Sequence, residues 1–253
     1  MSFNFARSAQ AAGLLAASML WSTGARAQEA DHVAVGLGVG VIPGYQGSDA
    51  YRVRPLPMID VKQGPFFANR RNGVGVAVID TDTVTIGTSV TYVPGYHRSD
   101  APAGIDKVDA AAGARIFTTV HAGGFVFNVG ATKAVSGSVK GLVADAVVAY
   151  PVTVSPRISL TPSLATTWAD EKHNNGYFGV TAGESLASGL APYSAGGGFK
   201  DVSASLTASY HLTDRITMSA TTSVTTLLGD AKSSPIVFKR TQPSALLVTS
   251  YRF

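Results

Sequence analysis

Apolar and small polar residues alternate along most of the chain, and this is the pattern of β-strands whose two faces meet different surroundings. The clearest run is "DVSASLTASYHL" at 201–212, where every second residue from Val202 is apolar and the residues between them are Ser, Thr or His. The same alternation returns at 215–228 and between 152 and 168. The sequence therefore predicts an all-β chain.

The polar faces of these runs carry mainly Ser, Thr, Gly and Ala rather than Lys and Glu. A soluble β-sandwich usually carries charges on the face that meets water, so it is the less favoured alternative. Small polar residues on one face and apolar residues on the other are typical of an antiparallel transmembrane β-barrel with a polar lumen. The runs are roughly 10–15 residues long, as tilted membrane strands require.

The turn spacing predicts twelve strands, at roughly 33–42, 51–61, 65–70, 73–79, 83–94, 106–119, 122–134, 139–150, 153–168, 197–211, 215–228 and 241–253. With this even number, tight connections such as "KQG", "DTD", "TDR" and the Tyr150-Pro151 corner share one side of the membrane. All the long connections, at 43–50, 95–105, 169–196 and 229–240, fall on the other side, as in bacterial barrels. Ten strands, without the short runs 65–70 and 73–79, is the alternative that keeps this parity.

The N-terminal residues have the layout of a secretory signal peptide, with Arg7, an apolar stretch "AQAAGLLAASMLW" and an Ala25-Arg26-Ala27 cleavage site. We expect residues 1–27 to be removed and residues 28–253 to form one barrel domain. Loss of two arginines lowers the net charge from +4 to about +2, and no basic run remains that would indicate a nucleic-acid partner. Cys is absent, so disulfides and thiolate metal sites are excluded.

The last residues, "LLVTSYRF", place Leu247, Tyr251 and Phe253 on one face. This ending resembles the C-terminal signal that the barrel assembly machinery of Gram-negative bacteria reads, with Tyr251 and Phe253 as its main residues. Thr249 departs from the apolar residue often found on that face. The ending therefore predicts a protein of the outer membrane, in contact with its lipid.

Two prolines, Pro55 and Pro57, lie on the outward face of the predicted strand 51–61. Proline has no N–H group to donate to a neighbouring strand. We therefore expect this strand to be unpaired or bulged beside them, with the short hairpin 65–79 next to it.

Three ordered blocks resemble a known family. "YQGSDAYRVRPLPMID" followed by "GPFF", "YFGVTAGESLASGLAPYSAGGGFKDV" at 177–202 and "LLGDAKSSPIV" at 227–237 are similar to blocks of the MipA/OmpV family of outer-membrane proteins. The resemblance covers about 31–253. It implies an outer-membrane barrel and, from the family's namesake, a scaffold that joins a lytic transglycosylase (the murein hydrolase MltA) to a murein synthase in peptidoglycan remodelling. Family members are also linked to antibiotic susceptibility.

The sequence carries few motifs for catalysis or metal binding. The five histidines lie on separate predicted strands or loops without metal-ligand spacing: His32, His97, His121, His173 and His211. A hydrolase like the outer-membrane phospholipases is not supported by any G-x-S-x-G motif. The Gly-rich "GLGVGVIPG" alternates like a strand, and no helix pattern follows it, so it is not a phosphate loop. We expect no enzymatic activity and no cofactor.

Charged residues opposite the apolar faces form the candidate site. Strand parity places in the lumen Arg52, Arg54, Asp60, Asp109, Arg115, Asp145 and Arg157. One interpretation is a solvated barrel interior with mutually paired charges. The other is a small-solute or anion channel, or a pocket for a small ligand, whose arginines favour anions and which affects outer-membrane permeability.

The segment 169–196 is long for a hairpin connection. Within it, Thr181 and Glu184 have the spacing to cap a short helical turn at 184–189. We expect the segment to form a lid over the lumen, with Tyr177, Phe178 and Tyr193 as its apolar anchors.

Overall fold

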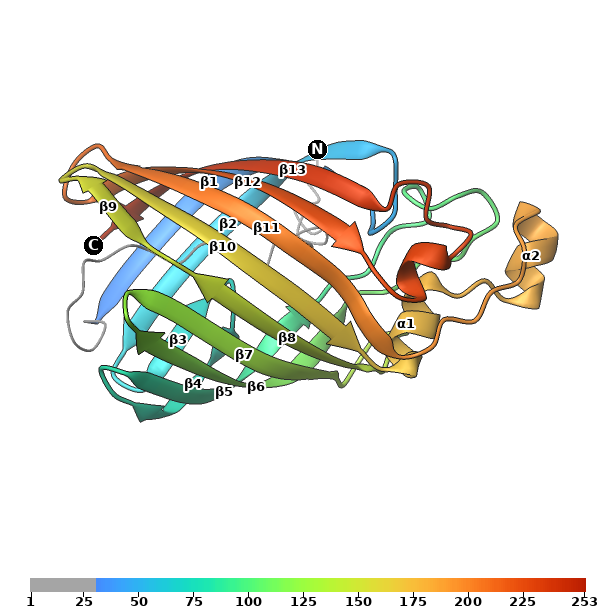
Figure 1. Cartoon of the computed structure of the whole chain (residues 1–253), viewed down its shortest axis with the longest axis horizontal. Coiled ribbons are helices and arrows are strands. Elements are labelled where there is room, and N and C mark those ends of the chain that lie inside the picture. The colour runs from blue at the N-terminus through green and yellow to red at the C-terminus, as the bar shows by residue number, and fades with distance from the viewer. Residues whose placement is uncertain (1–30) are drawn as a thin grey trace, which may run out of the picture.

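The computed structural model describes residues 31–253, and the expected signal peptide lies outside this range. Antiparallel strands form one sheet that closes on itself, because β1 pairs with β13 and β10 pairs with β11 (Figure 1). The strands are β1 (His32–Pro43), β2 (Tyr51–Gln63), β3 (Phe66–Asn69), β4 (Gly73–Asp80), β5 (Val84–Val93), β6 (Ala111–Ala122), β7 (Phe125–Ala134), β8 (Leu142–Ala149), β9 (Val152–Ser155), β10 (Ile158–Ala169), β11 (Gly198–His211), β12 (Ile216–Leu227) and β13 (Thr241–Arg252). The predicted barrel is confirmed.

Strands β8 and β9 occupy one position in the wall, since both pair with β10 and only Tyr150-Pro151 separates them. The wall therefore has twelve positions, as predicted, rather than ten. The predicted turn at Tyr150-Pro151 is wrong, because the chain reverses six residues later, at 156–157. Proline interrupts a ladder by lacking an N–H group, and here the strand continues beyond the interruption.

The two faces of the wall differ as the alternation predicts. Outward side chains are apolar and exposed, with Leu37 at 66% and Ile116 at 65%. Inward hydroxyl groups bond to one another between strands, as in the pairs Ser163–Ser205 at 2.7 Å, Thr207–Thr221 at 2.9 Å, Ser209–Ser219 at 2.9 Å and Ser223–Ser244 at 2.6 Å. The lumen is thus polar but largely satisfied in its hydrogen bonds, which suits a narrow barrel interior.

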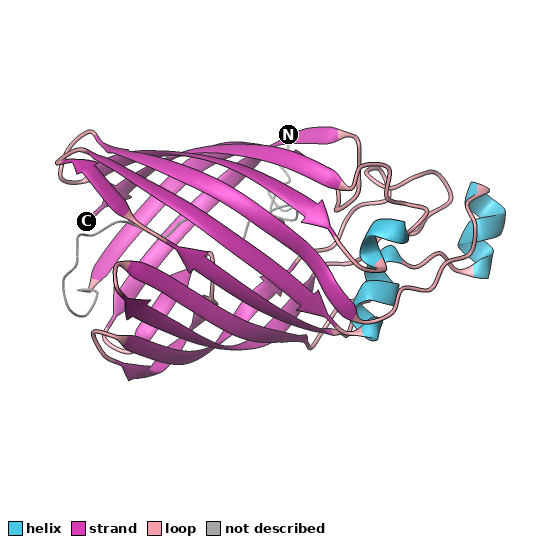
Figure 2. Cartoon of the chain, in the orientation of Figure 1, coloured by secondary structure: helices cyan, strands magenta, loops and turns pink. Residues whose placement is uncertain are grey.

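The two ends of the barrel are built differently. One end, called here the turn end, carries the tight connections 64–65, 81–83, 123–124, 156–157 and 212–215. The other, the loop end, carries the connections 44–50, 94–110, 135–141, 170–197 and 228–240. Its helices are α1 (Glu171–Phe178), α2 (Ala182–Ser188) and the 3-10 helix η2 (Ala231–Ser233), which Figure 2 shows gathered at this end. Among residues 31–253, none of the helices is long and apolar enough to cross a membrane.

Helix α2 begins at the predicted cap, because the Thr181 hydroxyl accepts from the Glu184 N–H at 3.2 Å and the Glu184 carboxylate accepts from the Thr181 N–H at 2.9 Å. It spans 182–188 rather than the predicted 184–189. Helix α1 is not predicted by the sequence pattern. It starts at Asp170, whose carboxylate accepts from the His173 N–H at 2.8 Å.

The wall has a seam beside β2. Strand β3 has four residues and pairs with β2 only at Val61–Gln63. Within the described range, no strand pairs with 51–60 on that side, a length of about 30 Å along an extended strand. The seam (the space between β2 on one side and β4 and β5 on the other) is the feature that Pro55 and Pro57 predict.

Candidate functional site in the barrel lumen

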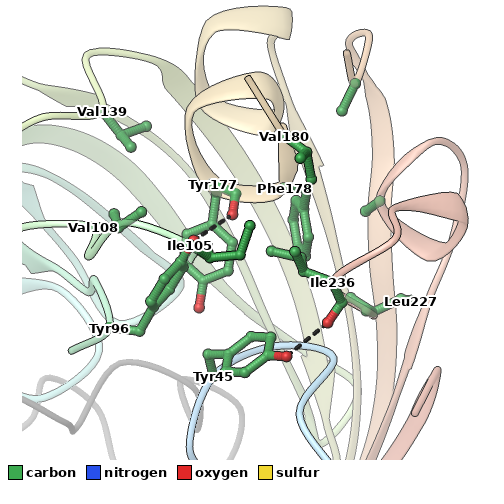
Figure 3. Close-up of a cluster of buried hydrophobic side chains, with 12 residues drawn as sticks. Tyr45, Tyr96, Ile105, Val108, Val139, Tyr177, Phe178, Val180, Leu227 and Ile236 are labelled. Atoms are coloured by element: carbon green, nitrogen blue, oxygen red, sulfur yellow. Dashed lines mark hydrogen bonds between the residues drawn. The ribbon is translucent and has the colours of Figure 1, made fainter. Parts of the chain in front are cut away.

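A buried aromatic and aliphatic cluster closes the lumen at the loop end. It draws on all five long connections, and we call it the plug: Tyr45, Tyr96, Ile105, Val108, Val139, Tyr177, Phe178, Val180, Ala195, Leu227, Ala231 and Ile236 (Figure 3). The rings of Tyr96 and Tyr177 meet edge to face, with centroids 5.1 Å apart. The cluster therefore ties segments that are far apart in sequence into one closure.

Hydrogen bonds reinforce the plug. The Tyr45 hydroxyl donates to the Ile236 carbonyl at 2.7 Å, and the Tyr96 hydroxyl donates to the Tyr177 carbonyl at 3.3 Å (Figure 3). The Ser234 hydroxyl donates to the Phe178 carbonyl at 2.5 Å. Helix α1 is therefore held through both its side chains and its last carbonyl groups.

The expected lid anchors lie in three different surroundings. Phe178 is fully buried and Tyr177 almost so, while Tyr193 packs against the rim of the plug and donates its hydroxyl to the Asp230 carbonyl at 2.7 Å. Helix α2 lies outside the plug, with Leu186 90% exposed. The closure is therefore made by α1 and its neighbouring loops, not by α2.

Beneath the plug, a charged network links α1 to the wall. Lys200 of β11 donates to the Gln46 side-chain oxygen at 2.7 Å and contacts Asp201. The Gln46 side-chain nitrogen donates to Asp201 at 3.1 Å, and its backbone N–H donates to the Tyr177 hydroxyl at 3.2 Å. This network lies between the plug and the space below it, and its residues line that space.

The lumen below the plug contains a cavity of about 600 Å³, within the usual range of ligand pockets. Four cationic and two acidic side chains line it, together with one histidine: Arg70, Arg71, Arg115, Lys200, Asp145, Asp201 and His173. Cationic side chains are therefore in excess by two. Such a lining favours anions.

Arg115 and Asp145 lie in the wall of this cavity. The Arg115 guanidinium donates to both Asp145 carboxylate oxygens, at 2.5 and 3.0 Å, and to the Asn72 side-chain oxygen at 3.2 Å. Arg115 is only 4% exposed. It lies against Gly130, where an added Cβ atom would come within 2.3 Å of the guanidinium. The bond to Asn72 fixes the β3–β4 turn, and with it Arg70 and Arg71, inside the lumen.

The other predicted lumen charges lie outside the cavity lining. Arg52 and Arg54 both donate to the carboxylate of Asp100 in the loop 94–110, each at 2.9 Å. Asp60 lies 3.4 Å from the His32 ring near the turn end.

Two of the predicted lumen positions are wrong. Asp109 precedes β6 and pairs with Lys107 at 2.7 Å in an exposed loop. Arg157 lies in the exposed turn 156–157, because the strand before it belongs to the previous wall position.

His173 faces the cavity from α1. Burial lowers the pKa of His173 to about 4, and Lys200 acts in the same direction, whereas Asp170 and Asp201 act against it. Its ring lies parallel to that of Tyr177, with centroids 6.2 Å apart. The His173 Nδ1 atom and the Asn174 side-chain oxygen, both in α1, are buried and find no hydrogen-bond partner among residues 31–253. Helix α1 thus carries buried polar groups whose hydrogen-bonding capacity is not satisfied in this structure.

Sequence reasoning missed Arg70, Arg71, Lys200 and Asp201. Strict alternation would turn one of the adjacent residues Lys200 and Asp201 outward, but a bulge opposite Thr167 and Trp168 buries both. The arginines stand in a turn between strands of four and eight residues, which are too short to reach the loop end. The short length of these two strands was the sequence signal that could have placed Arg70 and Arg71 inside the lumen.

Among residues 31–253, no three His, Asp or Glu side chains lie close enough together to hold a metal ion. At the turn end, the rings of Tyr251 and Phe253 meet edge to face, with centroids 4.9 Å apart.

Three known proteins are similar to this chain over most of its length. YiaT of Escherichia coli K12, which is named as an outer membrane protein, is 24% identical over 205 residues, or 79% of this chain and 82% of its own length. The NanC porin is 12% identical, with a TM-score of 0.46 over 87% of this chain and 98% of its own. The channel DcaP of Acinetobacter baumannii is 9% identical, with a TM-score of 0.39 over 92% and 99%.

The protein is an outer-membrane β-barrel whose outward-facing side chains are apolar. The model of one family, described as "MltA-interacting protein MipA", matches residues 35–253. Because this match covers most of the sequence, the chain belongs to the MipA family.

Proposed function

We propose that the barrel is a gated conduit for small anionic solutes. The observation that carries this proposal is the cavity of about 600 Å³, whose lining has two more cationic than acidic side chains and which lies directly beneath a closed plug. A polar interior that binds anions in several places allows them to pass in steps without being trapped.

Helix α1 is the proposed gate. Its aromatic side chains favour the closed position, because opening would expose apolar surface to water. Its unsatisfied polar atoms at His173 and Asn174 favour opening, because water would supply their missing hydrogen bonds. A segment balanced in this way moves at modest cost, and the lumen wall stays intact because its strands pair independently of α1.

Uptake by liposomes tests the conduit. Vesicles that contain the purified barrel should take up gluconate faster than glucosamine, which has a similar size and the opposite charge. Arg71→Gln should reduce the preference several-fold, whereas the matched variant Arg157→Gln, in an exposed turn, should leave it unchanged. Equal uptake of the two solutes, or a preference insensitive to Arg71, would overturn the proposal.

A scaffold in peptidoglycan remodelling is the second candidate function, favoured by the family match, since the family is named for interaction with MltA. Its partners would be a lytic transglycosylase and a murein synthase, bound at the turn end, which faces the periplasm in bacterial barrels. The turns there are short, so binding would use turn tips and strand rims. Pull-down of a murein hydrolase from solubilised membranes, lost when 81–83 and 123–124 are replaced, would support the scaffold. Retention by the replaced barrel would contradict it.

A further inference from the structure

Two prolines of β2, Pro55 and Pro57, suit its backbone to the unpaired edge at the seam. Successive N–H groups of a strand point to opposite sides, so the nitrogen atoms of Pro55 and Pro57 face the same side. The ladder with β1 is continuous across both prolines, from His32↔Lys62 to Pro43↔Tyr51. Their missing N–H groups therefore fall on the unpaired edge. In lipid an unpaired backbone donor is costly, and two prolines remove two such donors where no strand can accept them.

The seam is open to the cavity. The residues that line the cavity include outward-facing side chains on both sides of the seam, namely Pro57 and Ile59 on β2, Val74 on β4, and Val90 and Tyr92 on β5. Ile59, Val74 and Val90 are 56%, 65% and 60% exposed. The same cavity reaches Ser203 and Ser223 on the opposite wall. A continuous space therefore leads from the lipid-facing surface to the polar lumen.

The residues that line this space change from apolar at its outer part to cationic at its inner part. Its outer part is apolar, while the β3–β4 turn at its inner part brings Arg70 and Arg71 beside Arg115. Toward the loop end, Asp100 bridges to Arg52 and Arg54 and limits the seam on that side. The arrangement is complementary to a molecule with one apolar chain and one anionic head group.

We propose that the seam is a lateral portal through which a single-chain anionic amphiphile enters the lumen from the membrane. The head group binds among Arg70, Arg71 and Arg115, and the chain lies along Ile59, Val74 and Val90. An alkyl chain on this route stays in apolar surroundings, whereas the loop end would take it past the closed plug through water. This inference rests on the proposed function, because it uses the same cationic cavity and names its substrate class.

Photolabelling tests the portal directly. The probe is dodecyl phosphate with a photoreactive diazirine on its chain next to the phosphate head group, added to the barrel in phosphatidylcholine nanodiscs. After illumination, mass spectrometry should find the label on lumen-facing segments around Thr132, Ser203 and Ser223, in addition to lipid-facing residues. Arg71→Gln should reduce the lumen label several-fold.

A matched pair of variants locates the entry. Ile59→Trp narrows the seam, whereas Leu37→Trp places the same ring on the outward face of the neighbouring strand, away from the seam. The lumen label should fall at least fivefold in Ile59→Trp and stay unchanged in Leu37→Trp. Label confined to lipid-facing residues, or lumen label equal in both variants, would overturn the portal.

Binding of inorganic phosphate separates the two proposals. If calorimetry shows that the barrel binds phosphate through Arg71 but the lumen stays unlabelled, the portal is wrong and the anion conduit stands. If phosphate does not bind and the lumen stays unlabelled, both are wrong.

Discussion

Arg115 and Asp145 form a bidentate ion pair that spans three strands of the lumen wall, with nitrogen–oxygen distances of 2.5 and 3.0 Å. The guanidinium passes over Gly130 of the intervening strand β7 and also holds Asn72 of the β3–β4 turn. One side chain therefore connects the wall to the turn that carries Arg70 and Arg71. This connection makes the pair the organising contact of the cavity.

Loss of the pair should destabilise the barrel. Asp145→Asn leaves the buried guanidinium without its counter-charge, and we expect the free energy of unfolding to fall by about 2 kcal/mol, less than in a dry core because the cavity admits water. Urea unfolding in lipid vesicles measures this. Arg157→Gln, an exposed control, should change it by less than about 0.5 kcal/mol. An effect no larger than that of the control would contradict the organising role.

Gly130→Ala should disturb the same pair without removing a charge. The added Cβ atom would lie 2.3 Å from the guanidinium, so Arg115 must move away from Asp145, at a cost of about 1–3 kcal/mol. The variant that combines Gly130→Ala with Asp145→Asn should lose clearly less stability than the sum of the losses in the two single variants. A double-mutant cycle measures this difference. Gly183→Ala, with open space around its Cβ position, is the control. If the two losses of stability add without any difference, Gly130→Ala does not act through the Arg115–Asp145 ion pair.

Acidification should loosen α1. The pKa of His173 is about 4 in the closed structure, compared with about 6.5 in an unfolded or opened segment, so opening binds a proton. The closed form is therefore fully stable above about pH 6.5, and its stability falls by about 1.4 kcal/mol per pH unit down to about pH 4. Around the ring, Lys200 opposes protonation, while Asp170 and Asp201 favour it.

Hydrogen exchange of α1 amides between pH 7 and pH 4, corrected for the intrinsic exchange rate, measures this loosening. Protection should fall in the native protein and stay nearly constant in His173→Gln. Equal pH dependence in the two proteins would contradict the role of His173.

Pro57→Val distinguishes an open seam from a paired wall. In a paired wall, valine would add a ladder hydrogen bond and stabilise the strand. At an open edge facing lipid, it adds an unsatisfied N–H group, and we expect a loss of about 1–3 kcal/mol. Unfolding in vesicles gives the sign of the change, and a stabilised variant would contradict the seam.

The barrel was predictable because lipid on one side and a polar lumen on the other impose a period of two on every strand. The seam was also predictable, because Pro55 and Pro57 have no N–H groups to donate to a neighbouring strand. The plug was not, because Tyr45, Tyr96 and Ile236 gain their partners only through contacts between distant loops. Such contacts leave no periodic pattern in any single segment.

The candidate site was only partly predictable for a similar reason. Arg115 and Asp145 follow the alternation and were found by it. Lys200 escaped it because a bulge changes the parity of its strand, and Arg157 was misplaced because Pro151 resembles a turn but only interrupts the strand.

Single-channel recording in planar bilayers under a potassium chloride gradient tests most directly whether the plug gates an anion-conducting lumen. Removing the fully buried Phe178 ring weakens the closed state, while Leu186→Ala alters the exposed helix nearby. We expect rare openings for the native barrel and Leu186→Ala, and openings at least tenfold more frequent for Phe178→Ala, with a reversal potential that favours chloride. Silence of the folded Phe178→Ala barrel, or a reversal potential that favours potassium, would contradict this expectation.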